Sequence, residues 1–299
     1  MNNRIYFLIA AFALGAFGMM GCKKDHNVLA DASAGSKDAV GFGINNGDYI
    51  FLDIPGDLTV MDTSVNVFLS SGKTYGSDIT VTLTPNADLI TAYNDANGAA
   101  YDEMPSDTYT MPLTVTIPAN SKEGTAKLSI DLVKLLSHGI QFGLGFTVSS
   151  VQGGPSTILD DHKNLLIVAN VRNQWDGVYA YGPGSTISRN SATGPDPALS
   201  GSTEGLTVEL PTTSANTLSY VPVWHGGGGI AGIDGTYLTI DPATNEVTVA
   251  SAANPVLKNT VGEDNYYDPA TKTFHLAFDW GTAPNTRVVK ATLVYQGPR

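Results

Sequence analysis

The sequence has 299 residues, enough for two ordinary domains with a core each once an export segment is set aside. Its net charge of −12 argues against a nucleic-acid partner, whose phosphates require a basic surface, and against attraction to an anionic membrane face. The 32 glycines and 16 prolines, with only short helical patterns between them, favour an all-β chain with many turns.

The first 21 residues have the pattern of an export signal. Arg4 precedes an apolar run from Ile5 to Met20, which is short for a membrane span. The run ends in Met19-Met20-Gly21-Cys22, which resembles the lipobox of bacterial lipoproteins. We therefore expect cleavage before Cys22 and acylation of its thiol; the alternative is cleavage elsewhere, which leaves a free cysteine.

An acylated Cys22 would hold the protein on a membrane, because each buried CH₂ contributes about 0.8 kcal/mol. Lys23-Lys24-Asp25 resembles the short signal that sends Bacteroidota lipoproteins to the outer cell surface. We expect an outer-membrane, lipid-anchored, surface-exposed protein. Residues 22–40, which are rich in Ala, Ser, Gly, Asp and Lys, are interpreted as a flexible tether.

Residues 41–172 are predicted to form the first domain, an immunoglobulin-like sandwich of two sheets. A short helix is expected from Asp88 to Asn94, ending at Asn97-Gly98, and a second helical turn at Leu132 to Leu136. Seven alternating runs predict its strands: Tyr49–Asp53, Val65–Leu69, Ile79–Leu83, Leu113–Ile117, Thr125–Ile130, Phe142–Val148 and Leu165–Val171.

Three stretches of this domain, Val81 to Asn94, Tyr101 to Tyr109 and Val115 to Ala119, resemble a known family in order and spacing. It is the N-terminal domain of unknown function of many Bacteroidota surface lipoproteins of the polysaccharide-utilisation, or starch-utilisation-system-like, type. This chain has Met104 where Leu is commoner and Asn120 where Gly is commoner. The resemblance implies an immunoglobulin-like fold, of the kind found in front of chitinase-like glycosidase domains or glycan-binding domains.

Residues 173–299 are predicted to form a second antiparallel β domain, a sandwich or an open barrel. Asp241 to Asn245 and Asp268 to Lys272 share one turn pattern, with Asp-Pro opening a hairpin. The expected strands are Val178–Tyr181, Gly205–Leu210, Leu218–Trp224, Thr236–Ile240, Glu246–Val249, Thr273–Phe278 and Val288–Tyr295.

Patterns of catalytic and metal sites are incomplete. His225-Gly226-Gly227-Gly228 matches an oxyanion loop of esterases, but the companion G-x-S-x-G is absent, so we interpret it as a strand-end loop. Ser71 to Thr74 lacks the first glycine of a phosphate-binding loop. Asn94 to Gly98 and Asp160 to His162 are interpreted as surface turns, with a structural calcium as the alternative. We expect no cofactor and no metal.

All three tryptophans fall in the second domain. Glycan sites stack exposed aromatic faces on sugars beside a few polar groups. We assign Trp175 to the core or the domain junction. The candidate ligand-binding residues are Trp224, His225, Tyr266, Tyr267 and Trp280.

The expected function is that of a non-catalytic accessory lipoprotein that binds an oligo- or polysaccharide for an outer-membrane transporter complex. One alternative is a glycan hydrolase, which needs two carboxylates about 5–10 Å apart. Another is a structural or adhesive surface protein without a sugar site. A carboxylate pair in a pocket of the second domain would favour the hydrolase, and a flat exposed aromatic strip would favour the binder. The sequence does not give the relative positions of the candidate carboxylates, which are Asp176, Glu204, Glu209, Glu263 and Asp279.

Overall fold

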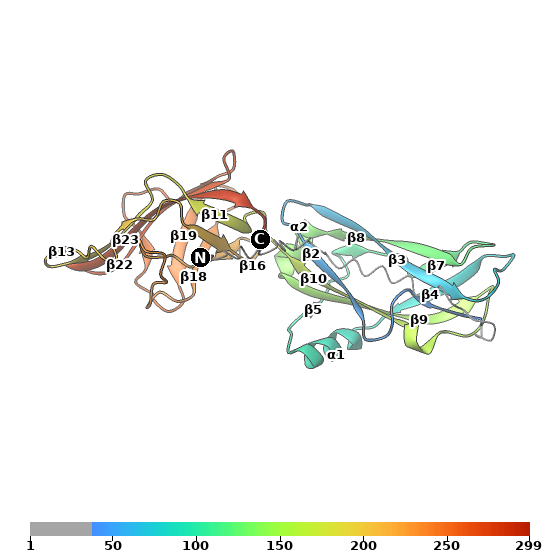
Figure 1. Cartoon of the computed structure of the whole chain (residues 1–299). Helices are drawn as coiled ribbons and strands as arrows, with labels where there is room; N and C mark the ends of the chain where they lie inside the picture. Colours follow the sequence, from blue (N-terminus) through green and yellow to red (C-terminus); the bar gives the residue numbers. More distant parts are fainter. Residues whose placement is uncertain (1–37) are drawn as a thin grey trace, which may run out of the picture.

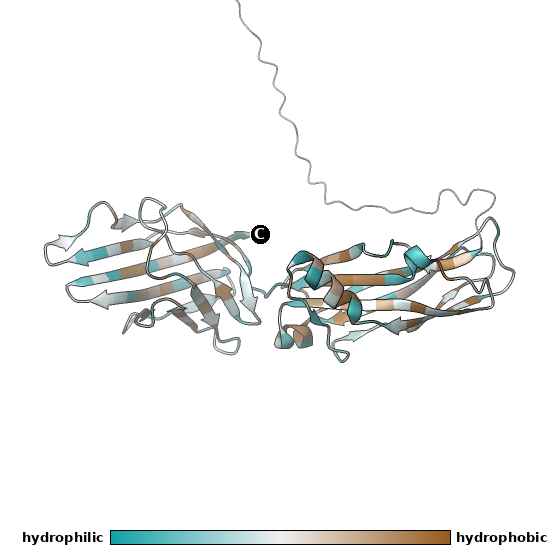
Figure 2. Cartoon of the chain, turned by 90° about the horizontal axis from the view of Figure 1, so that it is seen from below, coloured by the Kyte–Doolittle hydropathy of each residue, from teal (hydrophilic) through white to brown (hydrophobic). Residues whose placement is uncertain are grey.

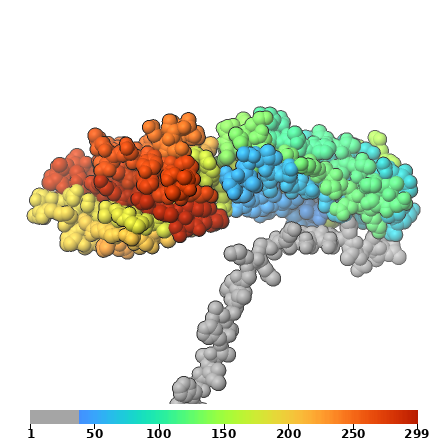
Figure 3. All heavy atoms as spheres, turned by 90° about the horizontal axis from the view of Figure 1, so that it is seen from above, coloured from blue at the N-terminus to red at the C-terminus, as the bar shows by residue number. Residues whose placement is uncertain are grey.

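A computed structural model describes residues 38–299 and shows two β domains in tandem, as the sequence predicts (Figure 1). The domains lie end to end in one elongated molecule (Figure 3). The predicted export signal, Cys22 and most of the tether lie outside the described residues. Ala39 and Val40, expected to close the tether, are instead buried in the first strand. Within residues 38–299, no helix has both the length and the apolar character needed to cross a membrane.

The first domain is a sandwich of a four-stranded and a six-stranded sheet. The four-stranded sheet has the order β1 (Ala39–Phe42), β3 (Val60–Ser70), β8 (Glu123–Asp131) and β6 (Tyr109–Thr110). The other has the order β2 (Tyr49–Ile54), β10 (Asn164–Val171), β9 (Gln141–Gln152), β4 (Ile79–Pro85) and β7 (Thr114–Ile117), with β5 (Asp102–Glu103) also beside β9. Pairing is antiparallel except for β2 with β10 and β5 with β9, so β2 is a parallel edge strand.

The core of this domain follows from the alternation of its strands. On β8, Ala126, Leu128 and Ile130 point inward and are buried, while the residues between them are exposed or half-buried. Phe142 and Phe146 of β9 are among the largest fully buried side chains. Burial of such a side chain contributes about 1.5–3 kcal/mol, so this inner layer holds the sheets together.

Helix α1 (Asp88–Asn97) covers the outer face of the six-stranded sheet, and it begins at Asp88 and ends at Asn97-Gly98 as predicted. It ends at Gly98, whose φ of 61° is in the left-handed region. Its Ile90 packs against Leu166 and Val168 of β10. Helix α2 (Leu132–His138) confirms the second helical turn and begins at Asp131, whose carboxylate accepts a hydrogen bond from the Lys134 amide at 3.1 Å.

The two departures from the family pattern have different structural settings. Asn120 has a φ of 63°, the conformation that Gly adopts at least cost and Asn tolerates better than most residues. Met104 is 2% exposed and occupies an apolar site in the core, as the commoner Leu would.

The second domain is antiparallel throughout. One nine-stranded sheet contains β13 (Gly194–Pro195), β12 (Thr186–Ser191), β23 (Asn285–Gly297), β11 (Gly177–Tyr181) and β15 (Thr207–Leu210), with β14 (Gly201–Ser202), β22 (Thr273–Thr282), β21 (Tyr266–Asp268) and β20 (Lys258–Asn259). A four-stranded sheet has the order β16 (Thr212–Ser214), β17 (Thr217–Ser219), β18 (Thr236–Ile240) and β19 (Val247–Ser251).

These two sheets meet at both edges. The chain passes directly from β15 to β16 at Pro211, and on the other side Glu246 forms a bridge with Tyr266. The result is a curled, barrel-like domain around one apolar cluster. In Figure 2, brown segments mark apolar residues along the strands of both domains. The predicted strand Leu218–Trp224 is wrong beyond Ser219, because Pro222 cannot donate to a ladder and the chain leaves the sheet.

The two predicted hairpin turns share their chemistry. Asp241 accepts the Ala243 amide at 2.8 Å, and Asp268 accepts the Ala270 amide at 2.9 Å. Each turn ends in a left-handed residue, Asn245 with a φ of 61° and Lys272 with a φ of 51°.

Candidate functional site

The two domains are joined by a network of charged side chains. Arg172, just after β10, donates to both carboxylate oxygens of Asp53, with Nε 2.9 Å from Oδ1. Its Nη1 donates to the backbone oxygen of Arg299 at 2.9 Å. In the second domain, Asp176 accepts from the Arg299 guanidinium at 3.0 and 3.2 Å. Arg172 therefore links an edge strand of the first domain to the end of the last strand of the second.

Asp176 is the most enclosed member of this network, with a side chain 2% exposed. It also accepts from Thr212, from the amide at 2.7 Å and from the hydroxyl at 2.8 Å. Burial alone would raise the pKa of Asp176, but the hydrogen bonds from Arg299 and Thr212 outweigh it and hold the pKa below its ordinary value. The same contact raises the pKa of Arg299. Both groups are charged at neutral pH. We call Asp53, Arg172, Asp176, Thr212 and Arg299 the junction network.

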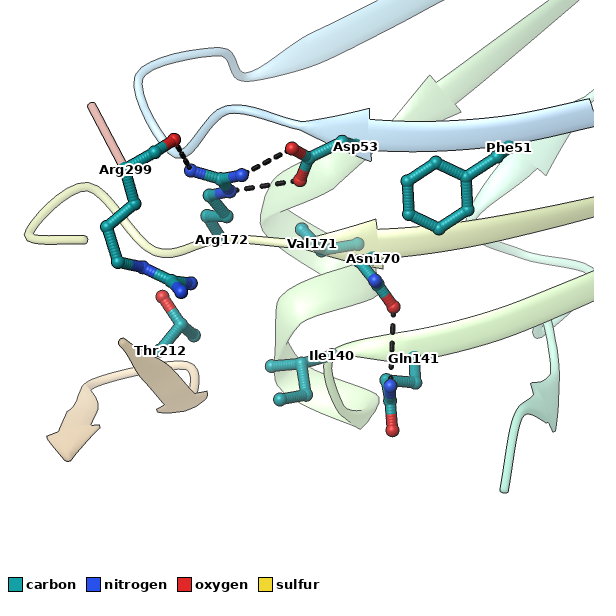
Figure 4. Close-up of a pocket in the computed structure, with 9 residues that line it drawn as sticks. All are labelled: Phe51, Asp53, Ile140, Gln141, Asn170, Val171, Arg172, Thr212 and Arg299. Carbon is teal, nitrogen blue, oxygen red and sulfur yellow. Dashed lines mark hydrogen bonds and ion pairs between the residues drawn. The ribbon is translucent and has the colours of Figure 1, made fainter. Parts of the chain in front are cut away.

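A cavity of about 370 Å³ lies beside this network, with walls from both domains (Figure 4). Phe51 stands at its side with half of its surface exposed, and Gln141 donates from Nε2 to Asn170 Oδ1 at 3.4 Å. The lining residues are Phe51, Asp53, Ile140, Gln141, Asn170, Val171, Arg172, Thr212 and Arg299. The cavity thus combines an aromatic ring, two side-chain amides and charged groups.

Strand register explains why these side chains share one face. Asp53 lies opposite Asn170, and Asn170 lies opposite Gln141, so a row of polar groups crosses β2, β10 and β9 on the outer face. Along β2 the same face carries Tyr49 and Phe51, which are 45% and 50% exposed. We call Tyr49 and Phe51 the aromatic strip.

The aromatic strip is supported from one side by helix α1. The Tyr49 ring lies edge-on to Tyr93 of α1, with centroids 4.8 Å apart, and Tyr93 contacts Tyr101 at 5.6 Å. Such edge-to-face pairs contribute about 0.5–1.5 kcal/mol beyond burial. The strip is therefore fixed at its Tyr49 end and open at Phe51, where the cavity begins.

Two of the residues predicted to bind ligand lie in the core. Trp280 is 4% exposed and stacks on Phe278 with centroids 6.1 Å apart. Tyr267 is 7% exposed and lies between Trp175 and Phe274. The requirement for an exposed ring face is not met by Trp280 or Tyr267, because their strand positions point inward. Trp175, 2% exposed, has the core role that the sequence predicts.

The other three candidates are accessible: Trp224 and His225 are neighbours in one loop, and Tyr266 lies on β21. Tyr266 is 41% exposed and stacks on His275 at 4.5 Å. Trp224 is half-buried against the apolar cluster of the second domain. The exposed His225 places Nδ1 2.6 Å from the Ser202 backbone oxygen. The structure therefore does not bring the five residues together into one site.

Sequence reasoning missed the face formed by Phe51, Asn170 and Gln141. The alternation of Tyr49 to Asp53 shows two aromatic residues and a carboxylate on one side of a strand. Nothing local indicates that this strand pairs in parallel with a strand more than a hundred residues later, and that pairing builds the polar row.

Of the carboxylates considered for hydrolysis, Asp176 and Glu209 lie near the same residue, Arg299, and the other three lie on separate segments. Asp176 belongs to the junction network, Glu263 is ion-paired with Lys290, and Asp279 lies opposite Lys258 on β20. Glu204 and Glu209 are exposed at the surface. Among residues 38–299, no group of three or more His, Cys, Asp or Glu side chains is arranged to hold a metal ion.

Comparison with known proteins supports the fold. A family model described as a "-like, N-terminal domain" matches residues 44–155, most of the first domain. A Bacteroides ovatus protein described as structural genomics, unknown function, superposes with a TM-score of 0.60 and 14% identity, over 87% of this chain and 95% of that one.

A second protein of the same description from Bacteroides ovatus gives a TM-score of 0.47 at 12% identity, over 85% of this chain and 93% of that one. An auxiliary nutrient binding protein from Bacteroides thetaiotaomicron gives 0.44 at 14% identity, over 82% and 89%. Curated proteins contain no significant match. At 14% identity the likeness to the first of these structures concerns the fold alone.

Proposed function

We propose that this protein is a non-catalytic glycan-binding protein and that an oligo- or polysaccharide binds along the aromatic strip into the cavity between the domains. The observation that carries the proposal is the exposed pair Tyr49 and Phe51. Phe51 lies at the cavity that the side-chain amides of Asn170 and Gln141 also line. Aromatic faces stack on the C–H patches of sugar rings, and side-chain amides pair with their hydroxyls.

The dimensions of the site fit this use. Residues two apart on a strand are about 7 Å apart, so the two rings can contact neighbouring parts of an extended chain. The cavity of about 370 Å³ is within the range of small-molecule sites, and a domain junction is a common position for one. Arg172 and Arg299 contribute N–H donors at its inner end.

Binding fits the cavity better than hydrolysis does. Its carboxylate, Asp53, has both oxygens held by Arg172. A glycosidase needs one carboxyl group free to give a proton and a second placed across the scissile bond. Asp53 in its ion pair is suited to orient Arg172.

The wider role follows the sequence. Acylated at Cys22, the protein would present both domains at the outer-membrane surface and pass captured glycan to a transporter complex. Cys22→Ser should move the protein from the membrane fraction to the soluble fraction of cells, because the thiol that carries the acyl chains is gone. A variant that still fractionates with membranes contradicts the anchor.

The binding site is tested by Phe51→Ala in gels that contain a polysaccharide. Removing the exposed ring should weaken retention about tenfold or more, since stacking dominates weak sugar sites. Val133→Ala is the matched control, because Val133 is 64% exposed on α2 and lies apart from the cavity. Equal retention of Phe51→Ala and wild type on every polysaccharide that wild type binds would exclude this site.

Trp224→Ala tests the site expected from sequence. Trp224 remains a candidate because it is half-buried beside the exposed His225 and four glycines. If Trp224→Ala loses retention and Phe51→Ala is retained as wild type is, the glycan site lies in the second domain.

A further inference from the structure

The second domain has another polar cavity, of about 570 Å³, at its end away from the first domain. It lies where the hairpin of β12 and β13 meets the turn between β22 and β23. Its lining consists of Arg189, Asn190, Ser191, Thr193, Gly194, Pro195, Asp196, Pro197, Asn285 and Arg287.

Two arginines in this cavity stand directly opposite each other. Arg189 of β12 and Arg287 of β23 are register partners in an antiparallel pair. Directly opposite side chains share a face and have Cβ atoms about 4.5–5.5 Å apart. Like charges in this position destabilise a sheet, so local packing does not account for the pair.

The two arginines lie at the edge of the apolar core, one inward-facing pair of residues beyond the last buried apolar pair. The preceding row is apolar, with Ile187 opposite Val289 and both buried. In the arginine pair itself, Arg287 on β23 lies between Arg189 on β12 and Trp280 on β22. The two guanidinium groups therefore extend from the inner face of the sheet at the open end of the barrel, a position where barrels bind ligands.

The arginine pair is only partly neutralised. Arg189 Nη1 is 3.3 Å from Asp196 Oδ2. Arg287 Nη1 donates to the backbone oxygen of Asn285 at 2.9 Å, and within residues 38–299 its guanidinium forms no ion pair. Two arginines against one aspartate leave one positive charge over the cavity, in a chain whose net charge is −12.

The surrounding groups complete a site for an anion. The Ser191 hydroxyl donates to the Gly194 backbone oxygen at 2.8 Å, so the Thr193 hydroxyl, 3.1 Å from it on the hairpin wall, is the one that can donate to an oxyanion. The hydrogen bond to Asn285 fixes one edge of the Arg287 guanidinium, and its other N–H groups are available. Guanidinium groups bind carboxylate and sulfate oxygens through paired, charge-assisted hydrogen bonds.

We propose that Arg189 and Arg287 bind a carboxylate or sulfate group of an acidic polysaccharide at this end of the second domain. The proposal rests on the proposed glycan-binding function for the polymer to which that group belongs. It adds a second contact on the second domain, at the end that faces away from the first domain and its aromatic strip. Because the net charge of −12 repels a polyanion elsewhere on the protein, the local positive charge of this cavity is the feature that attracts an acidic group.

The test compares full-length Arg287→Gln with wild type in gels that contain polygalacturonate, dextran sulfate or neutral dextran. Loss of the charge-assisted hydrogen bonds should weaken binding to at least one acidic polymer about tenfold or more. Retention by polygalacturonate alone identifies a carboxylate ligand, and retention by dextran sulfate alone identifies a sulfate ligand. Arg287→Lys, which keeps the charge, should recover part of the affinity.

Lys258→Gln is the control, because it removes the same charge from an exposed position on β20. Circular dichroism of each variant verifies the fold. The proposal is overturned if wild type binds neither acidic polymer, if Arg287→Gln binds as wild type does, or if Lys258→Gln loses as much affinity. Phe51→Ala, run in the same gels, separates the two sites: it should weaken binding at the aromatic strip and leave the dependence on Arg287 intact.

Discussion

At the scale of single residues, Asp176 anchors the second-domain side of the junction network, and Arg172 Nη1 of the first domain lies 3.6 Å from its Oδ1. Its buried carboxylate accepts hydrogen bonds from Thr212 and Arg299. Asp176→Ala leaves the Arg299 guanidinium and the Thr212 amide without their partner. Breaking a buried pair in this way should lower the free energy of unfolding by about 3 kcal/mol, measured by urea denaturation at pH 7. Asp160→Ala, at a carboxylate 94% exposed, should change it little.

The charge on Asp176 also predicts a pH dependence. Its folded pKa is below the ordinary value of 3.8, so ionisation favours the folded state above that value. This stability is fully present above about pH 5 and is lost as the pH falls through the lower folded pKa. The stability difference between wild type and Asp176→Asn should therefore be constant from about pH 5 to 8 and shrink below about pH 4. A difference that grows on acidification would contradict the sign of the shift.

Some of these residues could be recognised from sequence alone and others could not. Trp175 was assigned to the core or the domain junction, and it is buried in the core of the second domain, a few residues after the strand that ends the first. Trp280 and Tyr267 were predicted to bind ligand, but both are buried. Whether these side chains point inward or outward depends on the strand register, because a shift of one residue exchanges the inner and outer faces of a strand. Phe51 was overlooked because the alternation places Tyr49 and Phe51 on one face of a strand but does not indicate which other strands complete that face.

At the scale of elements, the placement of helix α1 depends on two glycines of β9. A Cβ on Gly145 would lie 2.1 Å from the Asn86 backbone oxygen, and one on Gly143 would lie 2.8 Å from the Ile90 side chain. Gly145→Ala should therefore force the start of α1 from the sheet and lower the free energy of unfolding by about 1–3 kcal/mol. Urea denaturation measures the loss.

The matched control is Gly72→Ala, where an added Cβ meets no atom within 4 Å. Equal changes in the free energy of unfolding for both variants would contradict the predicted steric contact. The change in Gly145→Ala would then come from backbone entropy.

Long strands and both hairpin turns were predictable because each carries its own periodicity or turn chemistry. The alternation on β4 and β8 specifies which face is buried, and Asp241 with Asp268 specifies the turns. Strands of two residues, such as β5 and β14, are too short to show the alternation of apolar and polar residues that predicts a strand. They form because neighbouring strands supply partners for their backbone groups.

At the scale of the whole molecule, the candidate glycan site depends on topology more than on any motif. The cavity draws residues from β2, β9, β10, β16 and the last residue of the chain. Sequence indicated two β domains with a junction near Trp175, but the parallel pairing of β2 with β10 is a long-range contact. The polar wall therefore became visible only in the folded chain.

The junction network predicts that Arg172 sets the relative position of the two domains. Arg172→Ala removes the contacts with Asp53 and with the Arg299 backbone, while each domain keeps its own apolar core. Both domains should stay folded and move more freely, so small-angle scattering should give a broader distribution of interatomic distances. Glycan retention should fall as well, because the cavity needs walls from both domains.

Lys127→Ala is the control for Arg172→Ala, since its ion pair with Asp62 is largely exposed and lies within the first domain. It should leave both the scattering profile and the retention unchanged. An Arg172→Ala variant with wild-type scattering and weaker retention would make Arg172 a direct ligand contact and not a positioning residue. Unchanged retention with broader scattering would show that the aromatic strip binds glycan without the second domain, which would restrict the site to Tyr49, Phe51 and the amides beside them.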